Sequence, residues 1–311
     1  MTLCAFDITA DGVATATGDA PPDTGYRWVH FDLGDADLPA FLDTHVPAIP
    51  AAALVAPETR PRADRFGDGL ILNLRGVNLN ADGPADQMVA VRMWVTAQWV
   101  VTVRVRKVFA LNALRQEAEQ GHAPATPMAF VSTLAARLMG RVQDTVFDLS
   151  GRVDQMEDSV QEDDSPLPPD LAEERRMAIR MRRYLAPQRD ALVALVGTDS
   201  VLMTQGARDL LREQANLAKL TVEELEGLIA RMTAVQDHHT AQAAMRQGRN
   251  GYVLSIVAAV FLPLGFVTGL FGVNVAGVPG TGTPWAFAAL CLALVAMTAG
   301  AVWVLRRIKW I

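Results

Sequence analysis

The spacing of hydrophobic residues divides the chain into stretches with different periods. In residues 1–105, short segments rich in Val, Trp, Phe, Leu and Ile are separated by Pro, Gly and Asp clusters, which is typical of strands. The predicted strands are Leu3–Ile8, Tyr26–Leu33, Leu70–Leu74, Met88–Trp94 and Trp99–Val105. After Lys107, hydrophobic residues recur every three or four positions, and this period predicts helices.

Two helices and a longer third one follow from this period. Phe130–Val160 ends before the helix-breaking run SPLPPD, and Leu171–Val196 contains Pro187, where it is expected to bend. The third pattern starts near Gln205 and contains no proline up to Leu262. Continued to residue 270, it would form a helix of about 100 Å. Such a length requires packing partners, so the pattern predicts a stalk bundled within one chain or between chains.

An uncharged stretch then predicts membrane spans. Residues 251–305 contain no Asp, Glu, Lys, Arg or His. Within them, Tyr252–Phe271 and Trp285–Leu305 are each long enough to cross the hydrocarbon core of a bilayer. Basic residues flank the two outer ends of this pair, while the connecting loop has no charge. The positive-inside rule therefore places both termini in the cytoplasm.

These patterns predict seven consecutive regions. They are a cytoplasmic α/β domain (1–105), cytoplasmic helices (106–203), a stalk helix (204–250), transmembrane helix 1 (251–271), an external loop (272–284), transmembrane helix 2 (285–305) and a basic cytoplasmic tail (306–311). The start of the chain lacks the basic and apolar regions of a secretory signal, so the first 250 residues are expected to stay in the cytoplasm.

Charge and motifs narrow the classes of function. All 34 acidic residues precede residue 251, against 25 of the 28 basic ones, so this part carries a net charge of −9. An acidic protein of this kind is not expected to bind nucleic acid. The sequence contains no nucleotide-binding loop, zinc-protease motif or nucleophile elbow, which predicts a protein that is not an enzyme and uses no cofactor.

One face of the first membrane segment consists almost entirely of small residues. Steps of four and three residues from Gly251 give Gly251, Ser255, Ala258, Leu262, Gly265 and Gly269, and the same steps backwards give Gly248, Ala244 and Asp237. The opposite face is bulky and apolar, as lipid contact requires: Val253, Ile256, Val260, Leu264, Val267 and Phe271.

Two interpretations of the small face remain open from spacing alone. Small residues allow close packing between helices, and they also leave room for a hydrated ion in a pore that Leu262 would narrow. Asp237 would be an ordinary solvated side chain in the first case. In the second, copies of it around an axis would form a carboxylate ring that attracts cations.

At the end of this helix the sequence FLPLGFVTGLFGVN (261–274) resembles the CorA superfamily of divalent-cation channels and transporters. The hallmark of that superfamily is a Gly-Met-Asn tripeptide, and here the tripeptide is Gly272, Val273 and Asn274. The valine, the following VAGVPG and the closing RRIKWI look like the zinc-transporting ZntB branch. So do ETRPR (58–62), LRGVN (74–78) and RRYLAPQRDAL (182–192).

The resemblance implies a cytoplasmic αβα domain, a long stalk helix and two C-terminal membrane helices, assembled as a homopentameric funnel in the inner membrane. It implies that Gly272, Val273 and Asn274 form a selectivity mouth, and that the small face lines the pore. It also implies that the partners are other copies of the chain, the lipid bilayer and divalent cations. The transported ion would be zinc, taken up with protons.

The metal ligands themselves are less directly indicated. Asn274 would bind a hydrated ion through its amide oxygen, without adding charge. Zinc prefers Cys and His, and the loop has neither, so the zinc assignment rests on the resemblance. Asp237 and His238 are further candidates near the inner end. A magnesium, cobalt or nickel channel and a non-transporting membrane scaffold remain alternatives.

Overall fold

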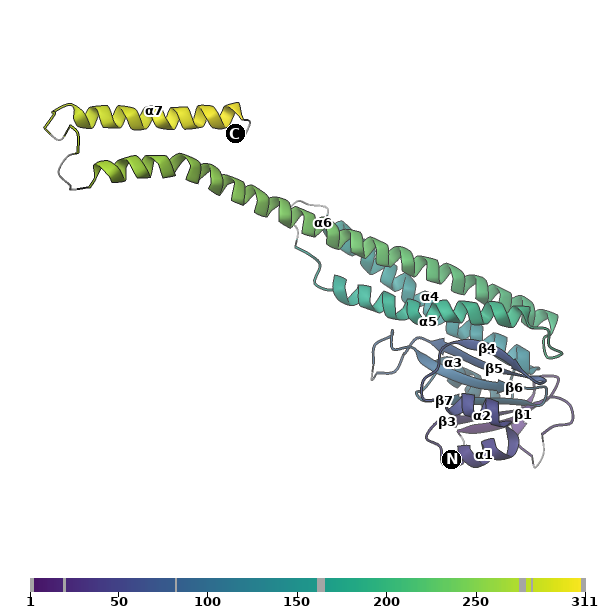
Figure 1. Cartoon of the computed structure of the whole chain (residues 1–311). Coiled ribbons are helices and arrows are strands. Elements are labelled where there is room, and N and C mark those ends of the chain that lie inside the picture. Colours follow the sequence, from purple (N-terminus) through teal and green to yellow (C-terminus); the bar gives the residue numbers. More distant parts are fainter. Residues whose placement is uncertain are drawn as a thin grey trace. The chain divides into compact units, whose positions relative to one another are not determined.

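The computed structural model describes residues 3–18, 21–81, 83–160, 166–273, 278–280 and 282–308. The chain divides into two compact units, Met1–Val235 and Gln236–Ile311. We call them the N-terminal unit and the C-terminal unit. Helix α6, Gln205–Phe271, belongs to both (Figure 1).

A seven-stranded sheet forms the centre of the N-terminal unit. Its strands are β1 (Cys4–Ile8), β2 (Ala14–Ala16), β3 (Tyr26–Asp32), β4 (Arg62–Phe66), β5 (Gly69–Gly76), β6 (Val89–Val95) and β7 (Trp99–Arg104). Their order across the sheet is β2-β1-β3-β7-β6-β5-β4. The pair β3–β7 is parallel and every other neighbouring pair is antiparallel.

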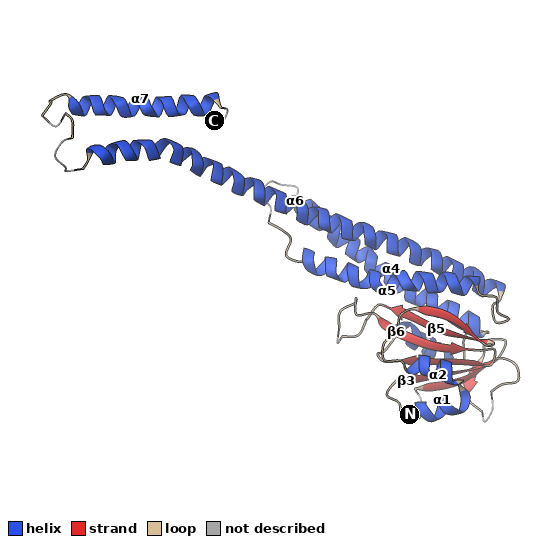
Figure 2. Cartoon of the chain, in the orientation of Figure 1, coloured by secondary structure: helices blue, strands red, loops and turns tan. Residues whose placement is uncertain are grey.

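Helices cover both faces of this sheet (Figure 2). They are α1 (Leu38–His45), α2 (Ala48–Val55), α3 (Phe109–Glu119), α4 (Pro127–Ser159) and α5 (Leu171–Gly197). Strand β3 is buried on both sides, which explains why its apolar and aromatic residues Tyr26, Trp28, Val29 and Phe31 do not simply alternate with exposed polar ones; Arg27 and His30 are buried as well. Trp28 faces the larger core with α3 and α4, while Phe31 faces the smaller core with α1 and α2. The N-terminal unit is therefore an αβα sandwich, as expected.

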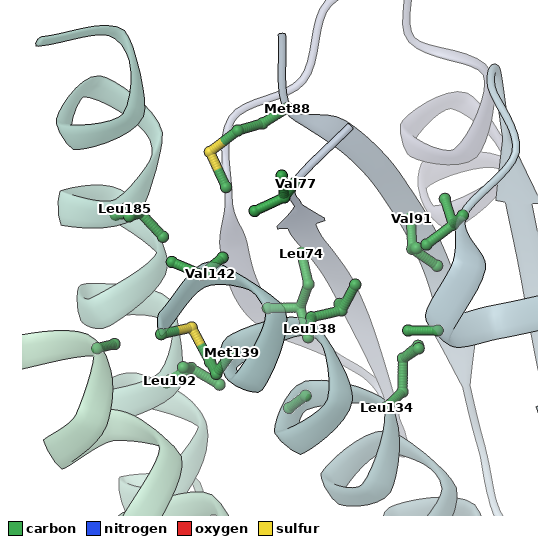
Figure 3. Close-up of a cluster of buried hydrophobic side chains, with 14 of the residues drawn as sticks. Leu74, Val77, Met88, Val91, Leu134, Leu138, Met139, Val142, Leu185 and Leu192 are labelled. Atoms are coloured by element: carbon green, nitrogen blue, oxygen red, sulfur yellow. The ribbon is translucent and has the colours of Figure 1, made fainter. Parts of the chain in front are cut away.

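The larger core joins the sheet to a layer of long helices. Leu74 and Val91 from the sheet, Leu138 from α4 and Leu185 from α5 gather in one cluster (Figure 3). Helix α4 begins at Pro127, where the hydroxyl oxygen of Thr126 accepts a hydrogen bond of 3.1 Å from the amide of Ala129. Repeated burial every three or four residues along α4 then stabilises the layer.

The C-terminal unit contains the end of α6 and helix α7, Ala286–Arg307. Both helices include a segment long and apolar enough to cross a membrane. The observed helices confirm the two apolar helices expected from sequence. Helix α5 includes Pro187, and the bend expected there stays a prediction.

Candidate ion pathway

Helix α6 changes its surroundings near residue 235. In the N-terminal unit one side of it is buried in the larger core, for example Leu225 and Met232. Arg231 joins this part to α4: its Nε lies 2.9 Å from an oxygen of Glu157 and its Nη2 lies 2.5 Å from an oxygen of Asp154. Hydrogen bonds to Glu157 and Asp154 raise the pKa of Arg231, so it stays charged. From Gln236 to Phe271, no residue of α6 is buried.

The structure places all nine predicted pore-lining positions on α6 and leaves each of them exposed in the single chain. A side-chain carbon at Gly248, Gly251 or Gly269 would meet no other atom within 4 Å. Leu262, the one large residue in the series, is 77% exposed. The small face is therefore continuous and has no packing partner over most of its length within the described chain.

Part of the bulky side of the same helix is half-buried within the single chain. A shallow hollow is lined by Phe261, Leu264, Gly265 and Thr268 of α6 and by Leu294, Val295 and Thr298 of α7. Half-burial recurs along this side of α6 at Ile256, Val260, Leu264 and Val267. It recurs on α7 at Ala286, Leu290, Leu294, Met297, Thr298, Ala301 and Val302. Leu264 of the bulky face therefore borders α7, while Val253 and Phe271 are exposed, and lipid contact of this face stays a prediction.

The hydroxyl side chains of the two spans form hydrogen bonds within their own helices. The hydroxyl groups of Ser255, Thr268 and Thr298 donate to the carbonyl oxygens four residues earlier, at 2.9, 2.9 and 2.8 Å. These bonds remove the cost of an unpaired hydroxyl in an apolar surrounding. They also keep Ser255 compatible with either a packed or a water-facing small face.

The predicted selectivity mouth is described only in part. The amide of Gly272 donates to the carbonyl oxygens of Thr268 at 2.9 Å and Gly269 at 3.2 Å, which ends α6. A side-chain carbon on Gly272 would lie 3.1 Å from the Thr268 oxygen, so this tight ending favours glycine. Val273 is 48% exposed. Asn274 lies outside the described residues, and its role as an ion ligand stays a prediction.

At the other end of the small face, Asp237 is exposed and points away from the packed core, as does His238. His238 Nε2 lies 2.9 Å from Nε2 of Gln242 one turn further along α6. Within the described ranges, no three His, Cys, Asp or Glu side chains gather closely enough to hold a metal ion. A metal site involving Asp237 or His238 would need groups from further copies of the chain.

The N-terminal unit also contains a cavity that no linear pattern in the sequence predicts. Six arginines line it: Arg60, Arg75, Arg92, Arg106, Arg180 and Arg183. The segments 58–62, 74–78 and 182–192 were noticed only for their resemblance to a family. Their convergence depends on the sheet pairing and on α5, which a linear pattern does not show.

An αβα domain that leads through one long helix to two span-length apolar helices is the architecture expected of a membrane protein with a large domain outside the bilayer. The chain belongs to the CorA family: the family described as "CorA-like Mg2+ transporter protein" matches residues 23–307. The family members are transporters.

Within this family the sequence is similar to proteins named "Zinc transport protein ZntB". The protein of that name from Pectobacterium carotovorum is 35% identical, over 99% of this chain and 95% of its own length. The one from Yersinia enterocolitica is 31% identical, over 98% and 91%. These relatives confirm the resemblance to the ZntB branch.

Solved structures agree with the fold over the whole chain. The "full-length CmaX protein" is 29% identical and aligns with a TM-score of 0.85, covering 99% of this chain and 98% of that one. The CorA magnesium transporter from Methanocaldococcus jannaschii aligns with a TM-score of 0.79 over all of both chains. Its 15% identity supports the fold alone.

Proposed function

We propose that the protein is a homopentameric divalent-cation transporter of the inner membrane, with zinc as its principal ion. The pore is lined by the small face of α6. One observation carries the proposal: the small face is exposed in the single chain, while Ile256, Val260, Leu264 and Val267 on the bulky side are half-buried. A pore wall requires such an arrangement, because one face must stay free for the ion and the other must hold the outer helix.

The side chains on this face suit a hydrated divalent cation. Small side chains leave space for an ion that keeps its water, and Leu262 narrows the path at one level. Five Asn274 amides at the outer mouth accept hydrogen bonds from bound water without adding charge, so the ion is not trapped. Five Asp237 carboxylates at the cytoplasmic end raise the local concentration of cations.

Two further parts of the proposal, zinc as the ion and its coupling to protons, rest on the relatives and on the sequence rather than on the geometry of α6. Zinc is favoured because relatives over nearly the full chain are named zinc transport proteins. Residues 251–305 contain no Asp, Glu, Lys, Arg or His. A proton must therefore cross in pore water, with Asp237 and His238 as the candidate proton carriers at the inner end.

Zinc flux into liposomes, measured with a fluorescent indicator at several imposed pH gradients, tests the transport proposal. We expect zinc entry that increases when the proton gradient points in the same direction. Robust magnesium flux without zinc flux would favour the alternative of a magnesium, cobalt or nickel channel. A mass in detergent equal to one or two chains would contradict the pore, since two helices cannot enclose one.

Replacing Asn274 separates a pore from a membrane scaffold. We expect Asn274→Ala to lower zinc flux about tenfold or more, which corresponds to about 1.4 kcal/mol in the barrier. Asn216→Ala, at an exposed position of α6 in the N-terminal unit, is the matched control and should transport normally. Equal flux in both variants would show that Asn274 takes no part in permeation.

A further inference from the structure

The arginine-lined cavity of the N-terminal unit has a volume of about 610 Å³ and is built from segments far apart in the sequence. The loop after α2 contributes Arg60, strands β5 and β6 contribute Arg75 and Arg92, and helix α5 contributes Arg180 and Arg183. All of these residues lie in one compact unit. The ion pathway on α6 uses none of them.

Hydrogen bonds fix the walls of this cavity to one another. The backbone amide of Arg75 donates to Gln188 Oε1 at 2.6 Å, and Gln188 Nε2 donates to the Arg75 carbonyl at 3.0 Å, which joins β5 to α5. The guanidinium of Arg75 donates to the carbonyls of Thr59 and Met88, both at 2.7 Å. The loop, the sheet and the helix are therefore held in place before any ligand binds.

The cavity concentrates positive charge in a protein that is acidic overall. Its six arginines face only two carboxylates, Glu58 and Asp86. Asp86 is buried and forms an ion pair with Arg180. Among the described residues, no carboxylate lies within ion-pair distance of the other five arginines of the cavity. Such an excess of guanidinium groups is expected where an anion binds.

Arg92 is buried and Arg75 is half-buried, and each has a buried Nε donor that is unused. Arg92 is only 3% exposed; its Nη1 donates to the carbonyl of Leu54 at 3.0 Å, while its buried Nε has no partner. The Nε of Arg75 is also buried without a partner. Burial lowers the pKa of both residues, and the charge of Arg75 adds to the effect on Arg92. An anion would compensate both buried charges.

Other groups limit what kind of anion fits. The ring of Tyr184 stacks against the guanidinium of Arg75, 4.1 Å from the ring centre, and this contact holds one donor-rich side chain rigidly. Asp86 Oδ1 is buried without a hydrogen-bond partner and provides an acceptor for a hydroxyl or amino group. A ligand with several anionic oxygens and at least one such donor satisfies both sets of groups.

We propose that this cavity binds a small phosphorylated molecule with two or more phosphate groups and a hydroxyl-bearing portion, such as a nucleoside diphosphate. Each phosphate offers several oxygens to guanidinium forks that approach from the loop, the sheet and α5. Arg60, Arg106 and Arg183, which are exposed at the cavity, contact the outer part of the ligand, and Arg75 and Arg92 contact the inner part.

Calorimetric titration of the full chain in lipid nanodiscs with ADP, pyrophosphate or citrate tests this proposal. Metal-free buffer at low ionic strength removes zinc from the experiment, so the result does not depend on the transport proposal. We expect saturable binding of ADP and pyrophosphate, with citrate weaker than both. No saturable binding of the two phosphates, or citrate binding more tightly than either, would overturn the proposal.

Substitutions locate the binding in the cavity. The double variant Arg60→Gln, Arg183→Gln should weaken ADP binding about tenfold or more, because both side chains are exposed and neither forms an ion pair. Arg182→Gln is the matched control: Arg182 is adjacent to Arg183 but pairs with Glu226 at 3.0 Å and does not line the cavity. Thermal unfolding confirms that each variant is folded. Equal weakening in the control would mean unspecific charge attraction and would contradict the proposed site.

Discussion

The two parts of α6 differ in what surrounds them, although they form one helix. Between Gln205 and Val235 a buried stripe packs into the core of the N-terminal unit, whereas from Gln236 to Phe271 no position is buried. Helical stability comes mainly from the burial of an apolar face, so the first part is stabilised within one chain. Among the described residues, the second part has α7 beside it, and under the proposed function its remaining contacts come from lipid and from other copies. The difference separates residues that maintain the fold from residues available for transport.

Matched leucine substitutions give the largest expected contrast between the two parts. Leu225 is completely buried, and Leu225→Ala should lower the free energy of unfolding by about 2–5 kcal/mol. Leu262 is 77% exposed, and Leu262→Ala should leave that free energy unchanged while increasing ion flux. Urea unfolding of the full chain in detergent, followed by hydrogen exchange of β6 and β7, measures the first effect. A loss of stability in Leu262→Ala similar to that in Leu225→Ala would contradict the division of the helix.

We expect the loss of folding stability at acid pH to arise in the N-terminal unit. His30 is 2% exposed, with its Nδ1 2.9 Å from Thr102 Oγ1, and burial together with the charge of Arg104 lowers its pKa to about 4. Between pH 6.5 and about 4 the unfolded chain therefore binds a proton that the folded chain does not. Stability present at neutral pH is lost as the pH falls through this window, by about 3 kcal/mol at its lower end.

His30→Gln should flatten this acid dependence, measured as the urea midpoint at pH 7 and at pH 4.5. The exposed His122 supplies the control His122→Gln, which should keep the dependence of the unsubstituted chain. The membrane spans contribute none of it, because they contain no Asp, Glu, Lys, Arg or His. An unchanged acid dependence in His30→Gln would assign the effect to other groups.

The sequence predicts features within one helix or strand better than features that require several elements to come together. The apolar strands, the long helices and the small face follow from periodicity within one element, and the structure contains each of them. Strand β4 was missed because its sequence, RADRF, is mostly charged and lies at the sheet edge, where β5 is its only partner. Helices α1 and α2 were missed because they are short and contain prolines.

The same distinction applies to the candidate sites. The nine positions of the small face could be named from sequence because a fixed step of three and four residues places them on one side of a helix. That α7 borders α6 at Leu264 could not be predicted, since it depends on which side of α6 the returning chain meets. The arginine cavity needed five segments to be brought together, namely 57–60, Arg75, 86–92, 105–106 and 180–184.

A bulky substitution on the small face should reduce transport without affecting the N-terminal unit. Ala258 is exposed on this face, and Ala258→Leu places a large side chain where the proposed path holds a hydrated ion. We expect zinc flux to fall about tenfold, which corresponds to about 1.4 kcal/mol. Ala259→Leu makes the same change at the neighbouring exposed position outside the small face and should leave flux unchanged. An equal fall of zinc flux in the two variants would mean that added side-chain volume lowers flux at any position of the helix. That result would contradict the small face as the pore lining.

The smallest expected effect concerns the charge at the inner end of the small face. Asp237→Asn should lower zinc flux a few-fold at low ionic strength, because five fewer carboxylates attract fewer cations to the pentamer's inner mouth. The difference from the unsubstituted chain should shrink near 1 M salt, where the screening length is about 3 Å. Glu224→Gln removes an exposed charge from the packed part of α6, away from the small face, and should change flux less. A salt-independent loss in Asp237→Asn would instead indicate direct ligation of the ion by this carboxylate.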